Sequence, residues 1–162
     1  MAKEVDTIET DRLILRGINN TDAESIVLWR SNPEVYKYFK SPHRITLEEH
    51  LNWYQDRYLE NSNRFDWICL NKSTENRLGV FGLIKEKDKA EINYLVSPEG
   101  QHKGYALEVI RKLIDYAIKK WNSKQVIAEV HKDNIPSLGL VKKLGFDVVS
   151  EDDPFLIYGI EV

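Results

Sequence analysis

Residues 94–106 read Tyr94-Leu95-Val96-Ser97-Pro98-Glu99-Gly100-Gln101-His102-Lys103-Gly104-Tyr105-Ala106. This segment connects an apolar, β-rich run to an amphipathic one. The run over 90–96 predicts a strand, and the run over 103–121 predicts a helix because its apolar residues recur at helical spacing. The junction is therefore a strand, a turn and the start of a helix, where the first backbone N–H groups lack intrahelical partners.

The turn has the properties of a phosphate-binding site. Free N–H groups and the helix dipole both favour an anion at a helix start. Gly104 lets a ligand approach the backbone closely, and Lys103 adds a positive charge. The segment has no Gly-Lys-Ser or Gly-Lys-Thr triplet and lacks the further glycines of a dinucleotide fingerprint, so neither of those two motifs is present.

The pattern Gln101-x-x-Gly104-x-Ala106 resembles the pyrophosphate-binding signature of the GNAT superfamily of acetyl-CoA-dependent N-acetyltransferases. A second segment, 134–146, resembles the downstream asparagine-to-glycine-phenylalanine helix of that family. The resemblance covers nearly the whole chain and is closest to the branch that acetylates the N-termini of ribosomal proteins. It implies that acetyl-CoA is held by Asn134, by the backbones of Leu95 and Val96, and by Gln101, His102, Lys103, Gly104, Tyr105 and Ala106.

Composition limits the class of protein. The 162 residues, 42% of them apolar, suit one ordinary domain, so we expect a single domain over residues 1–162. A net charge of -3 argues against a general nucleic-acid binder. The single cysteine, Cys69, excludes an internal disulfide and fits a reducing compartment. Residues 1–6 contain no apolar signal region and no run could span a bilayer, so we expect a cytoplasmic protein with no membrane partner.

Local patterns predict the order of the elements. A strand is expected over 10–19, with Arg12 and Arg16 on its solvent side. Thr21 with Glu24 reads as a capping box for a helix over 22–31, which Asn32-Pro33 ends. A second box, Thr46 with Glu49, begins a helix through about residue 60. The further expected elements are strands over 65–70, 79–85 and 90–96, the helix over 103–121, a strand over 125–130, a short helix over 137–144, and strands over 146–150 and 155–161.

This order predicts an α/β (α+β) fold with a mixed, mainly antiparallel sheet flanked by helices. The family resemblance adds that the sheet splays after the strand holding Tyr94, Leu95 and Val96. It also implies that the pantetheine arm of the cofactor pairs with the strand edge exposed there.

Acetylation of an amine requires a group that accepts its proton. Alternation along 90–96 places Glu91, Asn93 and Leu95 on one face of the strand. Glu91 is the first candidate for the general base, directly or through a water, with an ordinary surface salt bridge as the alternative. Glu129, on the neighbouring strand, competes for this role. Water alone could suffice for an α-amine, which is easier to neutralise than a lysine amine.

The departing thiolate needs a hydrogen-bond donor or an acid. Many relatives use a tyrosine where this chain has Val141, so that acid is absent. The ribosomal branch has a serine in this helix, and Ser137 matches it. Ser137 is therefore the candidate that hydrogen-bonds or protonates the leaving sulfur, with a helix N-cap role as the alternative. Backbone N–H groups near Leu95 or Val96 are candidates for stabilising the oxyanion.

The acceptor site is less well defined. Trp29, Arg30 and His50 are candidates for binding the amine substrate, with core packing as the alternative for Trp29. Trp29-Arg30 followed by Ile45-x-Leu47-Glu48-Glu49-His50 also resembles acetyltransferases that act on nucleotide-linked amino sugars. The four histidines are scattered without ligand spacing, so we expect no metal site.

The sequence thus predicts an enzyme that transfers the acetyl group of acetyl-CoA to a primary amine by direct attack in a ternary complex. The acceptor is a protein N-terminal α-amine or a small amino compound. The alternatives are a nucleotide-linked amino-sugar N-acetyltransferase, a non-catalytic acyl-CoA-binding module, and an unrelated phosphate-binding domain. The oligomeric state stays open, a homodimer included.

Overall fold

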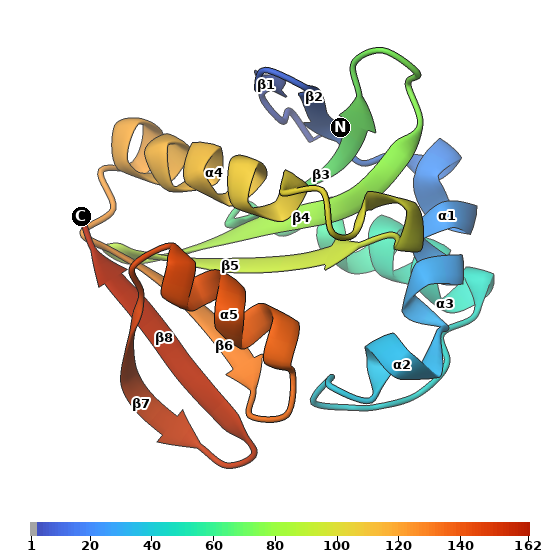
Figure 1. The fold of residues 1–162 in the computed structure, drawn as a ribbon. Coiled ribbons are helices and arrows are strands. Elements are labelled where there is room, and N and C mark those ends of the chain that lie inside the picture. The colour runs from blue at the N-terminus through green and yellow to red at the C-terminus, as the bar shows by residue number, and fades with distance from the viewer. Residues whose placement is uncertain (1–2) are drawn as a thin grey trace.

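The computed structural model describes residues 3–162, so Met1 and Ala2 of the segment considered for a signal region lie outside the described residues. Its centre is one sheet of eight strands in the order β1-β2-β3-β4-β5-β6-β8-β7 (Figure 1). All neighbouring strands are antiparallel except β5 and β6, which are parallel. The strands are β1 (Ile8–Glu9), β2 (Leu13–Gly17), β3 (Arg64–Asn71), β4 (Arg77–Glu86), β5 (Lys89–Val96), β6 (Gln125–His131), β7 (Asp147–Asp152) and β8 (Phe155–Glu161).

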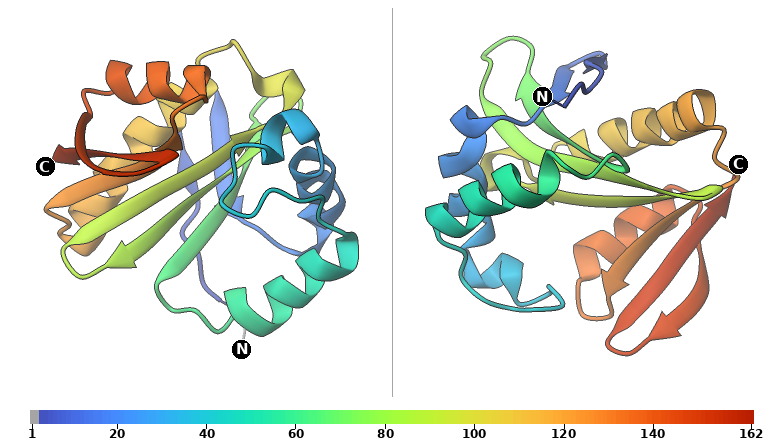
Figure 2. Two further views of the ribbon diagram at one scale, coloured as in Figure 1. Left: turned by 90° about the horizontal axis from the view of Figure 1, so that it is seen from below. Right: turned by 180° about the vertical axis from the view of Figure 1, so that it is seen from behind.

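The helices cover both faces of this sheet. They are α1 (Ala23–Arg30), α2 (Pro33–Tyr36), α3 (Leu47–Trp53), which continues as a π-helical segment (Tyr54–Tyr58), α4 (Tyr105–Trp121) and α5 (Ile135–Lys143). Figure 2 shows that α3 and α4 lie on opposite faces of β3, β4 and β5. The mixed, mainly antiparallel sheet flanked by helices confirms the predicted fold class.

Two buried clusters follow from strand alternation. Trp67, Phe81 and Ile92 point toward α4 and α5 and belong to the larger cluster, together with Val109 and Leu113 of α4. Residues of opposite parity point to the other face, because successive strand side chains alternate. There, Ile68 packs with Ile26, Trp29 and Tyr58 in the smaller cluster. Each face is thus sealed by its own helices.

The boundaries of the first helix differ from the expected ones. Thr21 and Glu24 do not form the capping box, so that prediction was wrong. The box is instead formed by Asn19 and Asp22 around a short 3-10 helix (Asn20–Asp22) that precedes α1. Asp22 is needed there because it is fully buried between two arginines. Arg16, expected on the solvent side of its strand, therefore turns inward to pair with Asp22 at 2.8 Å.

The second capping box was predicted correctly. Thr46 Oγ1 accepts a hydrogen bond from the Glu49 N–H, and the Glu49 carboxylate accepts one from Thr46 N–H, at the start of α3. The short helix α2 was missed, because Asn32-Pro33 was taken only as a helix end. In the structure Asn32 caps α2 and Pro33 occupies its first turn, a position where proline's missing N–H costs nothing.

The sheet opens between β5 and β6. Their parallel pairing runs from Lys89 with Gln125 to Ile92 with Ala128 and stops there. Beyond this point the two strands diverge from a common end, as Figure 1 shows, while β4 stays paired with β5 as far as Val96. The β6-facing edge of β5 from Asn93 to Val96 is therefore unpaired within the described sheet.

No helix among the described residues is long and apolar enough to cross a membrane.

Candidate active site

The turn between β5 and α4 ends at an uncapped helix start. Gly104 is the N-cap of α4 with φ of 77°, and no side chain caps the helix start. His102 also has a positive φ, of 62°. The first N–H groups of α4 thus lie at a helix start that no side chain of the described residues caps, and these donors together with the helix dipole suit a phosphate.

Charged side chains stabilise this turn through hydrogen bonds to its carbonyl oxygens. Arg12 Nη1 donates a hydrogen bond of 3.0 Å to the carbonyl oxygen of Lys103, and Arg12 also pairs with Glu108 of α4 at 2.8 Å. Lys103 Nζ donates to the carbonyl oxygen of Glu99 at 2.8 Å. The Lys103 side chain therefore bonds within the turn in this conformation. Arg12, which precedes β2, contacts both the turn and the first helical residues of α4 and so stabilises the start of the helix.

A cavity of about 380 Å³ lies on the other side of the open strand edge. Its floor is the face of the sheet that carries Glu91, Asn93 and Leu95, as strand alternation predicted. Cross-strand register extends this face, because Gly82 opposes both Asp66 of β3 and Asn93 of β5. The polar lining comprises Arg30, Lys40, His50, Arg64, Asp66, Glu91, Asn93 and Glu129.

Gly82 makes this polar row possible. A Cβ atom at position 82 would lie 2.1 Å from Asp66 Oδ1 and 2.7 Å from Asn93 Oδ1. Distances under 3.0 Å are not tolerated, so any larger residue would displace both side chains. The glycine therefore leaves room for two polar groups on the cavity floor. Asp66 Oδ1 is buried and has no hydrogen-bond partner among the described residues.

Two glutamates face each other across the opening of the sheet. Glu91 lies on β5 before the divergence, and Glu129 lies on β6 just beyond it. Burial raises the pKa of Glu91, and the charge of Glu129 raises it further. A carboxylate with a raised pKa is a better proton acceptor than an ordinary one. Lys40 lies beside them, with its Nζ 3.1 Å from Glu129 Oε2.

The helices α1 and α3 supply the opposite wall. The Arg30 guanidinium, at the end of α1, lies over the Phe39 ring at 5.3 Å and makes no hydrogen bond or ion pair with any residue from 3 to 162. His50 is 3% exposed, and burial followed by the charge of Arg30 lowers its pKa, so the imidazole is neutral. Trp29 does not line the cavity; it is 8% exposed and packs in the smaller cluster, as its core alternative predicted.

Helix α5 reaches the same opening from the other side. Its N-cap, Asn134, accepts a hydrogen bond from the Ser137 N–H, so this side chain serves the helix start. Tyr94 Oη donates a hydrogen bond of 2.7 Å to Ser137 Oγ. Burial raises the pKa of Tyr94, so the phenol keeps its proton. Strand alternation places Tyr94 on the face of β5 away from Glu91, and its hydroxyl connects β5 to α5.

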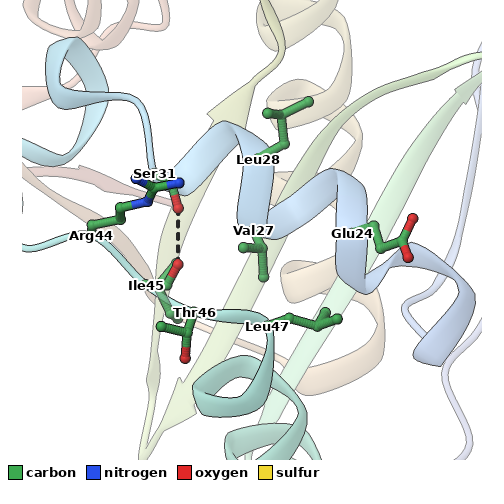
Figure 3. Close-up of a pocket in the computed structure, with 8 residues that line it drawn as sticks. All are labelled: Glu24, Val27, Leu28, Ser31, Arg44, Ile45, Thr46 and Leu47. Atoms are coloured by element: carbon green, nitrogen blue, oxygen red, sulfur yellow. Dashed lines mark hydrogen bonds between the residues drawn. The ribbon is translucent and has the colours of Figure 1, made fainter.

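A second hollow is larger but chemically poor. It measures about 470 Å³ and lies between the outer face of α1 and the segment Arg44–Leu47 (Figure 3). Val27, Leu28, Ile45 and Leu47 contribute apolar side chains, and Ser31 Oγ is already bonded to the Ile45 carbonyl oxygen at 2.9 Å. This hollow brings no set of polar side chains together around one point.

Among residues 3–162, no group of three or more His, Cys, Asp or Glu side chains is placed to hold a metal ion.

Comparison with known proteins decides between these chemistries. Residues 12–147 match the family model described as the acetyltransferase (GNAT) domain. The chain belongs to the GNAT acetyltransferases. A curated relative, the uncharacterized N-acetyltransferase YoaA of Bacillus subtilis, is 33% identical over 144 residues, which cover 86% of this chain and 81% of YoaA. This GNAT protein is therefore an acetyl-CoA-dependent acyltransferase.

Solved structures agree with the fold of this GNAT protein. A domain from Methanocaldococcus jannaschii superposes with a TM-score of 0.82 at 26% identity, covering 97% of this chain and 100% of that one. The spermidine N-acetyltransferase of Vibrio cholerae, solved in complex with CoA and spermine, superposes with a TM-score of 0.81 at 20% identity, covering 94% of this chain and 96% of that one.

Several residues at the GNAT site were missed by sequence reasoning. Asp66 is a charged residue within the apolar run 65–70, and that anomaly was a usable signal. Tyr94 belonged to the quoted turn segment, but nothing local indicated its contact with Ser137. Lys40 follows α2 and carried no pattern at all. Its approach to Glu129 joins two segments far apart in the chain.

Proposed function

We propose that this GNAT protein transfers the acetyl group of acetyl-CoA to a primary amine by direct attack in a ternary complex. The observation that carries the proposal is the opening between β5 and β6, where an unpaired strand edge, an uncapped helix start and a cavity with two carboxylates adjoin. The edge and the helix start suit a cofactor, and the cavity suits an amine. Both substrates thus reach one opening from opposite faces of the sheet.

Acetyl-CoA is proposed to bind along the open edge of β5 and at the start of α4. The proposed diphosphate contacts are the main-chain N–H groups from Gln101 to Ala106, including those of His102, Lys103, Gly104 and Tyr105. The edge of β5 at Leu95 and Val96, which pairs with no strand on the β6 side, is proposed to serve the pantetheine amides and the oxyanion. The Val96 carbonyl oxygen accepts a hydrogen bond of 3.4 Å from Gln101 Nε2 in this conformation, and the cofactor would replace it. Asn134 contributes through its position at the start of α5, although its side chain also caps that helix. When bound, acetyl-CoA supplies the activated acetyl group.

Glu91 is the proposed general base, directly or through a water, with Glu129 as the competing candidate. Its raised pKa and its place on the cavity floor support this role. The acceptor must lose a proton before it attacks, which costs about 4 to 5 kcal/mol for a lysine-type amine and about 1 kcal/mol for an α-amine at pH 7. A modest base is therefore sufficient for a protein N-terminus.

Ser137 is the proposed donor to the departing thiolate. A serine hydroxyl has one proton, and its direction decides what it can serve. Because the phenol of Tyr94 donates to Ser137 Oγ, the Ser137 proton is free to turn toward a third group. Tyr94 acts here as a positioning residue, since it orients the donor without touching the sulfur. The pair fills the role of the tyrosine that is absent at Val141.

The acceptor class follows from the charges in the cavity. A polyamine such as the spermine bound by the Vibrio cholerae structure carries further ammonium groups. The guanidinium of Arg30 opposes these groups, whereas the charge of Arg64 is paired with Asp66 at 3.1 Å. The free guanidinium of Arg30 instead favours an acceptor with an anionic or strongly polar group beside its amine. A protein N-terminal α-amine or a small amino compound remains the first proposal. A nucleotide-linked amino sugar is the second, because Arg30 and His50 line the same wall.

The proposal is tested by incubating the protein with acetyl-CoA and a panel of N-terminal peptides, UDP-amino sugars and spermidine. Release of free CoA thiol together with an acetylated product identified by mass spectrometry is the expected result. Binding of CoA without thiol release for any amine would favour the alternative, a non-catalytic acyl-CoA-binding module. Thermal-shift ranking of CoA against ATP and NAD tests the cofactor separately. A cytoplasmic location and a homodimer stay predictions.

A further inference from the structure

The segment after α2 bridges the two arms of the opened sheet. Lys40 Nζ contacts Glu129 Oε2 of β6 at 3.1 Å and lies 5.9 Å from the Phe155 ring centroid of β8. Tyr38 stacks at 5.4 Å against His131, also on β6. These contacts carry the segment from the α1 side of the molecule to the β6–β8 arm. As a result, a primary amine of the protein itself stands at the mouth of the cavity.

The surroundings of Lys40 are those that an acceptor amine requires. The lysine lines the same cavity as Glu91 and Leu95, and the negative charges of Glu129 and Glu91 both act on its ammonium group. Glu129 thus contacts its Nζ, and Glu91 and the proposed cofactor edge at Leu95 border the same cavity. Holding a nucleophile beside its reaction partner replaces a bimolecular encounter and accelerates the reaction.

Lys37 provides a matched comparison on the same segment. Its Nζ is also ion-paired, with Glu34 at 2.7 Å, and its side chain is 46% exposed against 64% for Lys40. An ion pair raises the pKa of both lysines. Neither amine is therefore more reactive than the other because it lacks a partner. The difference is location, because Lys37 does not line the cavity.

We propose that Lys40 is an internal acetyl acceptor, modified by the acetyl-CoA bound to its own chain when no external amine is present. The inference rests on the proposed function, since it uses the same cofactor and bases. The Lys40 ammonium loses one proton to Glu129 or Glu91, and from there to solvent. Its nitrogen then forms a bond to the acetyl carbonyl carbon, the carbon–sulfur bond breaks, and the second nitrogen proton ends on the departing sulfur as CoA thiol.

Acetylation of Lys40 changes the mouth of the cavity. The product amide is neutral, so the ion pair with Glu129 is lost and Glu129 keeps its negative charge without a partner. The bridge from α2 to β6 is then held only by the aromatic contacts of the segment. Self-acetylation therefore releases the carboxylate for an external amine. Because the ion pair with Glu129 raises the pKa of Lys40, the reaction accelerates with rising pH.

The test incubates the full chain with acetyl-CoA alone and follows each lysine by peptide mass spectrometry over time. Lys40 is expected to gain its acetyl group at least about tenfold faster than Lys37. The rate constant is expected to be independent of protein concentration, because the reaction is intramolecular. In Gly104→Glu, checked by calorimetry for loss of acetyl-CoA binding, the Lys40 rate is expected to fall to that of Lys37, which reports unassisted chemical acetylation.

Equal rates at Lys40 and Lys37, or a rate constant that grows with protein concentration, would overturn the inference. The amine panel is run in parallel to separate the two proposals. Turnover of an external amine in the panel, together with an unmodified Lys40 in the incubation with acetyl-CoA alone, refutes the inference and leaves the proposed function standing. Acetylation at neither place, with acetyl-CoA bound, refutes both.

Discussion

The phenol of Tyr94 on β5 donates a hydrogen bond of 2.7 Å to Ser137 Oγ on α5, across the gap that opens where β5 and β6 separate. This contact connects β5 to helix α5 beside the proposed site of reaction. Tyr94 also stacks on Phe81 of β4 with ring centroids 6.0 Å apart, so its ring is fixed independently of the hydroxyl. Removing the hydroxyl alone therefore tests its role.

Ser137→Ala should lower kcat by about 10²-fold, because the departing thiolate loses its donor. The KM for acetyl-CoA should change little, since most of the proposed binding groups lie on β5 and at the start of α4, and the bond from the Ser137 N–H to Asn134 does not involve the substituted hydroxyl. Steady-state kinetics with the preferred amine measures both values. An unchanged kcat removes Ser137 from the mechanism.

Tyr94→Phe should lower kcat about fivefold, the equivalent of one hydrogen bond of about 1 kcal/mol. In the Ser137→Ala background the same substitution should have no further effect on kcat, because Tyr94 acts through Ser137. Tyr116→Phe is the matched control, as it removes a phenol that bonds Asp6 on another part of the molecule. Additive losses in the double variant would contradict an orienting role.

Gly104→Glu should abolish CoA binding while the fold is kept. The added carboxylate stands at the helix start proposed to bind a diphosphate, and a positive φ costs a non-glycine residue of the order of 1 kcal/mol. Gly145→Glu adds the same charge at another exposed glycine with positive φ, of 87°. Calorimetric titration with CoA should show binding only for Gly145→Glu. A normal dissociation constant in Gly104→Glu rules the turn out as the cofactor site.

Glu91→Gln should lower kcat by about 10²-fold and remove the acidic limb of the pH–rate profile. The carboxyl must be deprotonated to accept a proton, so activity rises as pH rises through the pKa of Glu91. Burial and the charge of Glu129 raise that pKa above its usual 4.5, which moves the limb to higher pH. Glu161→Gln, at an exposed position of β8, is the control. Retention of the limb in Glu91→Gln would transfer the role to Glu129 or water.

Asp22→Asn should lower the free energy of unfolding by about 3 to 5 kcal/mol, because two arginines lose a buried partner. The Asp22 side chain is 0% exposed and lies 2.8 Å from Arg16 and 2.9 Å from Arg77. Urea unfolding at neutral pH measures the loss, with exposed Asp56→Asn as the control. A loss no larger than that of Asp56→Asn would show that the ion pairs contribute nothing net.

The same residue predicts a dependence of stability on pH. Burial alone would raise the pKa of Asp22, but hydrogen bonds from Arg16 and Arg77 outweigh it, so the pKa lies below its usual 3.8 in the folded state. A depressed folded pKa stabilises the protein above the unfolded pKa, and this stabilisation is lost as pH falls through the folded value. Urea midpoints should therefore drop at acidic pH less steeply in Asp22→Asn than in the parent.

Prediction from the sequence succeeded where the residues that define an element lie within that element. The helix over 103–121 was found through its apolar spacing, and α4 occupies 105–121. The capping box of Thr46 and Glu49 was found because its two residues are three apart. The box expected at Thr21 failed since Asn19, which precedes Asp22 by the same spacing, competed for it and Asp22 was required for buried ion pairs.

The residue order alone determined the succession of strands and helices, the glycine-containing turn before α4 and the strand face that carries Glu91. These features could be predicted because periodicity, caps and turn residues act within a few positions of the chain. Only the folded molecule decided which distant side chains meet. Tyr94 and Ser137 are 43 positions apart, and Lys40, in the segment after α2, reaches Glu129 of β6. Such pairs depend on how strands register and diverge, which is a property of the whole sheet and not of any segment.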